Sequence, residues 1–135
     1  MMKMKFFVFA AAVIAALSMT AVPASADLAG KVKKAQKQCN TCHSFKAGKK
    51  KAGPSLHKVV GRKCGAHEGY KYGKGYKKAC KKAAFVIDEA FLMDYLKNPS
   101  KHLKKLSGSK SGSKMSYKIK KEDVRKEVIT WLKTK

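Results

Sequence analysis

Apolar positions follow a helical period in three separate stretches of the chain. The first predicted helix leads up to a pair of cysteines, and its apolar face consists of Leu28, Val32, Ala35 and Cys39. The second lies within "IDEAFLMDYLKNP", residues 87–99, and its apolar face consists of Phe91, Leu92, Tyr95 and Leu96. The third lies within "KKEDVRKEVITWLKTK", residues 120–135, and its apolar face consists of Val124, Val128, Trp131 and Leu132.

The ends of these helices carry recognisable signals. Asp88 stands where an N-cap is expected, and Pro99 predicts a helix end near Asn98. After that proline, "SKHLKKL" (100–106) predicts a further short helix. In the last helix Glu122 precedes Lys126 by four residues, which is the spacing of a helical ion pair.

The stretches between the helices are rich in glycine and lysine. "FKAGKKKAGPSLHKVVGRKCG" (45–65) and "AHEGYKYGKGYKKAC" (66–80) predict little regular structure, and "SGSKSGSKMSY" (107–117) predicts a flexible loop that reaches Met115. No internal repeat or second domain is evident. The pattern predicts one small all-α domain with long loops.

The N-terminus has the pattern of a cleaved export signal. Lys3 and Lys5 precede the apolar run "FFVFAAAVIAAL", and "MTAVPASA" ends in small residues at 24–26. The alternative, an uncleaved membrane anchor, is disfavoured because the apolar run is too short to span a bilayer comfortably. We therefore expect residues 1–26 to be a cleaved secretory signal, residues 27–135 to be a single domain, and the protein to be periplasmic.

The chain is strongly basic, with 32 lysines and arginines against eight acidic residues and a formal charge of +24. Removal of the signal takes away two lysines and no acid, and leaves +22. Such a charge favours anionic partners, either acidic protein faces or transiently an anionic membrane surface. Nucleic acid is disfavoured, because the protein is expected to be exported and has no arginine-rich arm. The small size of the domain predicts a need for a metal, a disulfide or a large cofactor beyond its apolar core.

The stretch "QCNTCHSF", residues 38–45, contains the motif Cys-x-x-Cys-His, which has three chemical interpretations. A zinc site needs four ligands, but Cys64 and Cys80 are too widely separated in the sequence to form a second zinc knuckle. A redox dithiol of the thioredoxin kind needs a preceding strand, whereas the sequence predicts a helix. Covalent attachment of a c-type haem fits the motif best, with two thioethers to the haem vinyl groups and His43 as the proximal iron ligand.

The second axial ligand is less directly indicated. After residue 26 the methionines are Met93, within a predicted helix, and Met115, in the glycine and serine loop. Met115 is free to reach the far face of a haem, and a Met/His ligand pair raises the reduction potential. The alternatives are a second histidine, for which the candidates are His57, His67 and His102, or an open site.

With these residues in place, the chain resembles a class I cytochrome c of the longer bacterial kind, cytochrome c2. The resemblance covers nearly all of 28–133 and rests on "CNTCH", "GPSLHKVVGRKCG", "EGYKY", "DEAFLMDYLKNP", "KMSYKI" and "VITWLK". The lysine-rich "HLKKLSGSKSGS" suggests the longer bacterial branch. The resemblance as a whole implies an all-α cytochrome c fold, with three main helices, short helices and long loops around one covalently attached haem c.

The resemblance also implies roles for individual residues. Cys39 and Cys42 hold the haem, while His43 and Met115 bind its iron. The Pro54 carbonyl orients His43, and Tyr95 hydrogen-bonds near the Met115 sulfur. Further expected haem contacts are Arg62 and Tyr72 at a propionate, Ser113 and Lys114 at the crevice, and Tyr117 beside the haem. The alternative role of the three tyrosines is plain core packing.

Three positions depart from the family pattern. Ile87 stands where a tryptophan commonly bonds a propionate, so we expect a weaker hold on that charge or a replacement donor. Ala35 stands near the usual aromatic of the first helix, so the terminal helices should pack through Leu28, Val32 and Trp131. Gln38 replaces a common lysine, which removes one contribution to docking.

Once Cys39 and Cys42 are assigned to the haem, Cys64 and Cys80 remain in an oxidising compartment, and we expect them to form a disulfide. The alternative is a pair of buried free cysteines.

The function implied is one-electron transfer between redox proteins of a respiratory or photosynthetic chain, by a monomer without enzymatic activity. The resemblance implies docking lysines at Lys37, Lys49, Lys51, Lys101, Lys114 and Lys118. Alternative functions are a small haem enzyme or ligand binder with an open sixth site, and a cationic protein that binds surfaces.

Overall fold

The structure is a computed structural model that describes residues 23–135. Within this range there are five helices, α1 (Pro23–Cys42), α2 (Lys74–Ala83), α3 (Glu89–Lys97), α4 (Pro99–Ser107) and α5 (Glu122–Leu132). Two short strands, β1 (Arg62–Lys63) and β2 (Val86–Ile87), pair antiparallel. None of the described helices is long and apolar enough to cross a membrane. The predicted signal, residues 1–26, lies mostly outside the described range, and its last four residues open α1.

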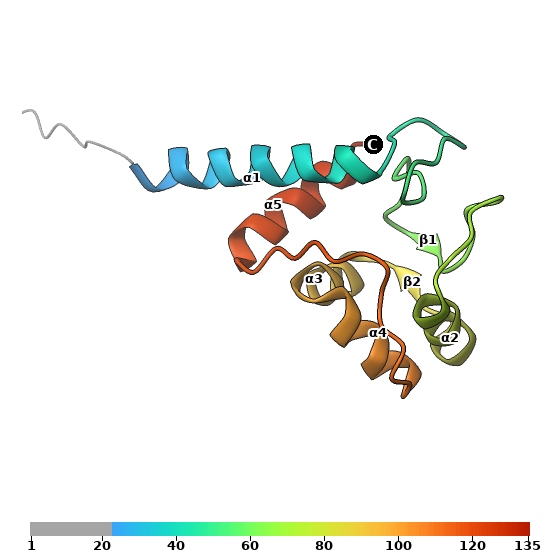
Figure 1. Ribbon diagram of the computed structural model, residues 1–135. Helices are drawn as coiled ribbons and strands as arrows, with labels where there is room; N and C mark the ends of the chain where they lie inside the picture. The colour runs from blue at the N-terminus through green and yellow to red at the C-terminus, as the bar shows by residue number, and fades with distance from the viewer. Residues whose placement is uncertain (1–22) are drawn as a thin grey trace, which may run out of the picture.

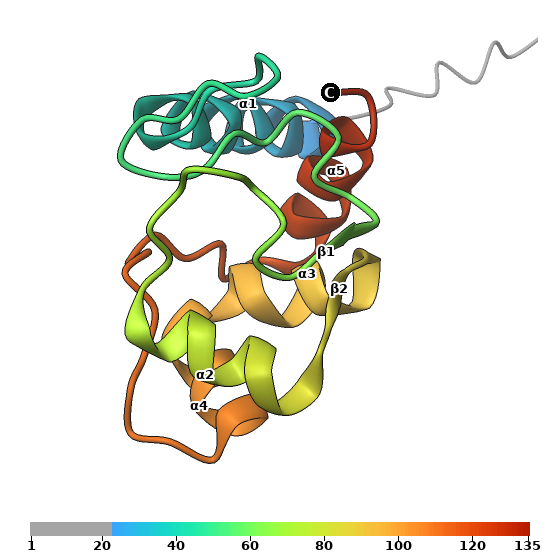
Figure 2. The same ribbon diagram turned by 90° about the vertical axis from the view of Figure 1, so that its right-hand side faces the viewer.

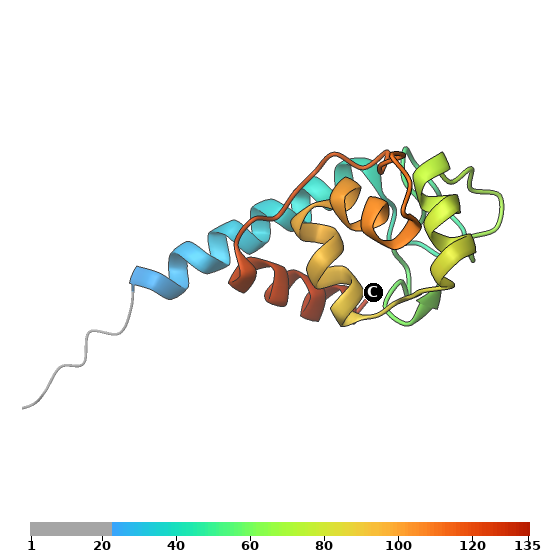
Figure 3. The ribbon, with the colours of Figure 1, turned by 90° about the horizontal axis from the view of Figure 1, so that it is seen from below.

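The two terminal helices pack against each other across one side of the fold, where α5 crosses beneath α1 (Figure 1). Seen from below, the N-terminal part of α1 projects beyond the other helices (Figure 3). Leu28, Val32 and Trp131 contact the core as expected, and Ala35 is buried within it. Phe45 also meets the Trp131 ring edge-on, with 5.0 Å between ring centroids. An aromatic from the loop after α1 therefore contributes at this contact.

Local signals set the middle helices as predicted. The Asp88 side chain accepts a hydrogen bond from the N–H of Phe91 at 2.7 Å and caps α3. Asn98 ends α3 and also caps α4, because its side chain accepts from the N–H of Lys101 at 3.1 Å. Pro99 is the first residue of α4, where its missing N–H costs nothing. The Glu122–Lys126 ion pair of α5 is present at 2.7 Å.

The prediction of little regular structure in 66–80 was wrong at its C-terminal end, where α2 begins at Lys74. The helix forms because it packs closely against α4 and the loop that follows, on the far side of the fold from α1 (Figure 2). Gly75 permits this approach, since a Cβ there would lie 2.0 Å from the carbonyl oxygen of Gly112. Tertiary packing thus overrides the weak helix propensity of a segment that carries Gly73 at its N-cap and Gly75 in its first turn.

The core lies between α3, α4 and α5 and includes residues from both ends of the described chain. Its most deeply buried members include Leu103, Val128, Ile129 and Leu132. The loop of residues 108–121 crosses α3, where the N–H of Ile119 donates to the carbonyl of Leu96 at 2.8 Å. Arg125 fastens the end of this loop to α5, because its guanidinium donates to the carbonyls of Ile119 and Lys120 at 2.9 and 2.7 Å.

Candidate functional site

Helix α1 carries both cysteines of the motif to one wall of a large cavity. Cys39 and Cys42 lie one turn apart at its C-terminus, and both line the cavity. Cys39 is buried, which raises the pKa of its thiol to about 11. Zinc binding and dithiol chemistry use the thiolate, so this environment favours neither. Within residues 23–135 no three His, Cys, Asp or Glu side chains form a metal-binding group.

His43 follows Cys42 directly and is held by the next loop. Its Nδ1 lies 2.8 Å from the carbonyl oxygen of Pro54, and because a carbonyl can only accept, Nδ1 carries the proton. Burial is the main cause that lowers the pKa of His43, and the charge of Lys51 adds to it, while the Pro54 bond opposes it. The ring is therefore neutral near pH 7, with the Nε2 lone pair free to bind a metal.

The ring of His43 also packs closely against the backbone of Gly53. A Cβ at that position would lie 2.3–2.9 Å from three ring atoms. Only glycine leaves room for the imidazole here, so Gly53 and Pro54 together fix the orientation of His43. The site prediction included Pro54 but not Gly53.

Met115 lines the same cavity and lies in the loop after α4. Ser113 shapes this loop, because its hydroxyl accepts from the N–H of Met115 at 3.0 Å and lies 2.9 Å from the Tyr95 hydroxyl. The Tyr95 hydroxyl is thus bonded to Ser113, two residues before Met115. Burial raises the pKa of Tyr95, so it stays protonated. Ser100 adds a further bond, because its hydroxyl accepts from the N–H of Ser113 at 3.0 Å.

The other candidate axial ligands lie elsewhere. Met93, His57, His67 and His102 do not line the cavity. His102 instead packs edge-on against the Phe91 ring, 4.9 Å between centroids. Among the described residues, His43 and Met115 are the histidine and the methionine that reach the cavity.

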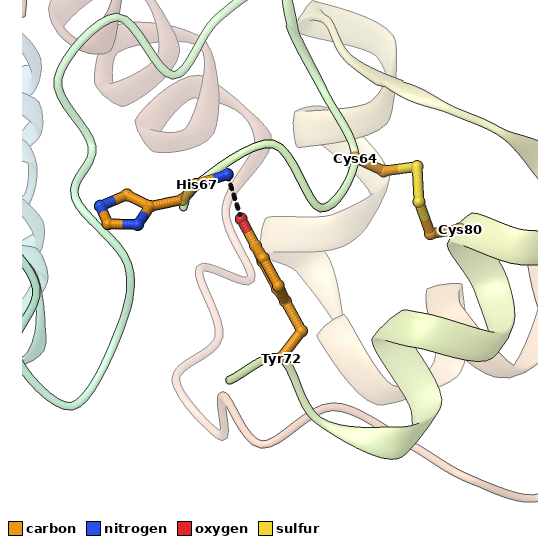
Figure 4. Close-up of a disulfide and its surroundings, with 4 residues drawn as sticks. All are labelled: Cys64, His67, Tyr72 and Cys80. Atoms are coloured by element: carbon orange, nitrogen blue, oxygen red, sulfur yellow. Dashed lines mark hydrogen bonds between the residues drawn. A yellow bond between two sulfur atoms is a disulfide. The ribbon is translucent and has the colours of Figure 1, made fainter. Parts of the chain in front are cut away.

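A polar group of residues lines the cavity near the β1–β2 pair. Arg62 donates to the carbonyl of Ser55 at 2.7 Å and to that of His57. The Tyr72 hydroxyl accepts from the N–H of His67 at 3.1 Å, which leaves its own proton free (Figure 4). β-Pairing sets Ile87 opposite Arg62, and Ile87 is only 8% exposed.

All eleven residues expected at the haem line this one cavity: Cys39, Cys42, His43, Pro54, Arg62, Tyr72, Tyr95, Ser113, Lys114, Met115 and Tyr117. The Lys114 stem lies across Gly73, where a Cβ would be 2.8 Å from it, and its Nζ reaches the carbonyl of Lys71 at 3.4 Å. The sequence prediction did not include the apolar wall, formed by Leu56, Val59, Ile87, Phe91, Leu92, Leu96 and Leu132, or the tyrosines Tyr70 and Tyr76.

This set of residues fits a covalently attached haem. Two thiols stand one helical turn apart, an imidazole with a free Nε2 follows them, and a thioether sulfur comes from a separate loop. The walls are apolar, and polar donors gather near β1. A covalently attached haem needs these features. Thiols react with its vinyl groups, a thioether sulfur and an imidazole nitrogen can bind its iron, and its ring needs apolar surroundings.

Comparisons with known proteins agree with this chemistry. The chain is 41% identical over 100 residues to cytochrome c-550 of Novispirillum itersonii, which covers 73% of this chain and 89% of that protein. It is 41% identical over 133 residues to cytochrome c2 of Cereibacter sphaeroides, with 88% of each chain covered. No protein-family model matches the chain.

Solved structures give the same result. The crystal structure of cytochrome c2 from Paracoccus denitrificans superposes with a TM-score of 0.66 and 30% identity, covering 78% of this chain and 96% of that one. The structure of cytochrome cH from Methylobacterium extorquens superposes with a TM-score of 0.61 and 33% identity. The match covers 79% of this chain and 98% of that one.

The fold and these similarities define a class I c-type cytochrome, and the chain belongs to this family. Within the class it is like the cytochromes c2, which are electron carriers rather than enzymes and which hold one covalently attached haem c. The predicted all-α cytochrome c fold is confirmed.

Proposed function

We propose that this protein is a soluble, periplasmic, monomeric one-electron carrier between redox proteins of a respiratory or photosynthetic chain. The observation that carries the proposal is that Cys39, Cys42, His43 and Met115 line one apolar cavity. Cys39 and Cys42 hold the haem as thioethers, and His43 and Met115 bind its iron. Bound haem supplies a reversible one-electron change at iron, and two protein ligands leave no position for a substrate.

The remaining cavity residues tune and protect this site. Pro54 keeps His43 in the tautomer that presents Nε2 to iron. Tyr95 and Ser113 hold the loop that carries Met115. Arg62 and Tyr72 line the cavity and would face a propionate, while Ser113, Lys114 and Tyr117 line it as well and would close the crevice. The apolar walls keep water from the iron, which favours electron transfer over ligand chemistry.

A redox titration tests this function directly. The exported holoprotein should take up one electron per haem reversibly, show low-spin ferric iron with the weak near-infrared band of sulfur ligation, and fail to bind carbon monoxide. High-spin iron that binds carbon monoxide readily would instead indicate a small haem enzyme or ligand binder. Intact mass of the exported protein should correspond to a chain from Asp27 with one haem added.

The charge of the protein suits acidic docking faces on the partners. The six lysines proposed for docking are all exposed, namely Lys37, Lys49, Lys51, Lys101, Lys114 and Lys118. Lys114 also lines the cavity, and Gln38 is exposed beside Cys39 without adding charge. Exposed charge of one sign around a redox site attracts anionic partners over distance and is screened by salt.

Salt dependence should therefore follow the charge of the reaction partner. We expect the rate of oxidation by the hexacyanoferrate(III) anion to fall about tenfold between low and high ionic strength. The rate with the cationic tris(phenanthroline)cobalt(III) complex is the control, and it should rise with salt. Rates that stay flat with both oxidants, measured by stopped flow, would rule out steering.

A disulfide joins Cys64 to Cys80, with 5.7 Å between the two Cα atoms, and links the segment after β1 to α2 (Figure 4). We propose that it forms in the exported protein and stabilises the fold.

The double variant Cys64→Ser/Cys80→Ser should lose about 3 kcal/mol of unfolding free energy, because the loop that the disulfide closes becomes free in the unfolded chain. Guanidinium chloride unfolding measures the loss, and reduced wild-type protein should match the variant. Two thiols that alkylate in denatured, unreduced protein would overturn this.

A further inference from the structure

Ile87 leaves the polar side of the cavity without a hydrogen-bond donor at its position. This residue is buried, lines the cavity and is paired in register with Arg62. A tryptophan commonly donates to a haem propionate from this position in the family, but an isoleucine has no donor. A buried carboxylate without sufficient donors is costly, so another group should meet it.

Tyr76, one residue after Gly75 in α2, has the properties of that group. It lines the cavity, and its hydroxyl is fully buried without a hydrogen-bond partner among the described residues. Three other buried polar atoms lack a partner, in His67, His102 and Arg125, but none of these residues lines the cavity. A buried hydroxyl without a partner loses its hydration and gains nothing in return, so it normally marks a missing partner.

The Tyr76 ring is held firmly in place. It stacks on the Tyr72 ring with centroids 4.6 Å apart and meets Phe85 edge-on at 5.3 Å. Cys80, one turn further along α2, is tied to Cys64 by the disulfide, while Gly75 packs against the loop at Gly112. The hydroxyl is therefore positioned before any ligand arrives, which lowers the entropy lost on binding.

The surroundings keep this hydroxyl protonated. Burial is the main cause that raises the pKa of Tyr76, and the nearby hydroxyls of Tyr72 and Tyr95 act in the same direction. The backbone of Gly65 and the charge of Arg62 oppose the rise, although the hydroxyl makes no hydrogen bond to Gly65. Tyr76 is thus a neutral O–H donor at any physiological pH, suited to an anionic acceptor.

We propose that Tyr76 donates a hydrogen bond to a haem propionate and replaces the donor missing at Ile87. Tyr72 and Arg62 line the same cavity as the other members of this group. The inference rests on the proposed covalent haem, but it concerns its carboxylate rather than its iron ligands. The disulfide acts here as a positioning element for α2.

The variant Tyr76→Phe tests the proposal through the pH dependence of the reduction potential. Propionate ionisation appears as an inflection in that profile, and loss of a donor to the charged form should move it up by about one pH unit. Tyr70→Phe is the matched control, because the Tyr70 hydroxyl already donates to the carbonyl of Ala52 at 3.0 Å. It should leave the inflection in place.

An unchanged inflection in Tyr76→Phe would overturn the proposal. A second measurement needs no variant: NMR of the wild-type holoprotein should show a slowly exchanging Tyr76 hydroxyl proton close to the propionate methylene protons, and its absence would count equally against it. Both outcomes are separate from the proposed function, because the sulfur-to-iron band and the failure to bind carbon monoxide report on Met115. Loss of those features in wild-type protein would overturn the function instead.

Discussion

Replacing Met115 with leucine is expected to abolish the near-infrared sulfur-to-iron band and to let carbon monoxide bind the reduced protein. Leucine nearly matches methionine in size, so the apolar contacts remain, but it offers no atom that can bind iron. The hydrogen bond from the N–H of residue 115 to Ser113 is made by the backbone and should survive. The reduction potential should fall, because the Met/His pair is the ligand set that raises it.

Met93→Leu is the matched control for this experiment. Met93 lies in α3 and packs against the core, but it does not line the cavity. Its replacement should leave the spectrum, the potential and the failure to bind carbon monoxide unchanged. If Met115→Leu kept the sulfur band while Met93→Leu lost it, the assignment of the axial ligand would be wrong.

Much of the site could be predicted from sequence because its chemistry is carried by short motifs. Cys39, Cys42 and His43 are contiguous, and the end of a helix needs few long-range contacts to present them together. Met115 was predicted because few methionines follow residue 26 and because it lies in a glycine and serine loop rather than in a helix. Caps such as Asp88 and Asn98 were also local signals, and their hydrogen bonds are present.

The features that were missed depend on contacts between distant segments. Helix α2 needs the close approach of Gly75 to Gly112, and no local pattern encodes this approach. Arg125 is only 4% exposed and is satisfied by loop carbonyls, although its place in α5 resembles that of an ordinary surface charge. Tyr76 was counted within a glycine-rich loop, and its buried hydroxyl appears only once the fold closes.

The second large effect concerns the haem as part of the core. The variant Cys39→Ala/Cys42→Ala, purified free of haem, is expected to lose most of its helical circular dichroism and its cooperative thermal transition. Ile87, Phe91, Leu92, Leu96 and Leu132 belong both to the core and to the cavity wall. Burial of one such side chain contributes about 1.5–3 kcal/mol to stability. Partial exposure of all five side chains would therefore remove an amount close to the whole stability of a small domain, about 5–15 kcal/mol.

The charge of the chain adds to this loss, because self-repulsion among its many lysines opposes compaction when the apolar centre is absent. The control is Cys64→Ser/Cys80→Ser, which also removes two cysteines but leaves the haem attachment intact. It should keep the helix content of the wild-type holoprotein and differ only in stability. A haem-free Cys39→Ala/Cys42→Ala chain with full helix content and a sharp melt would show that the side chains around the cavity close on their own, and that the haem is a ligand of a preformed core rather than its centre.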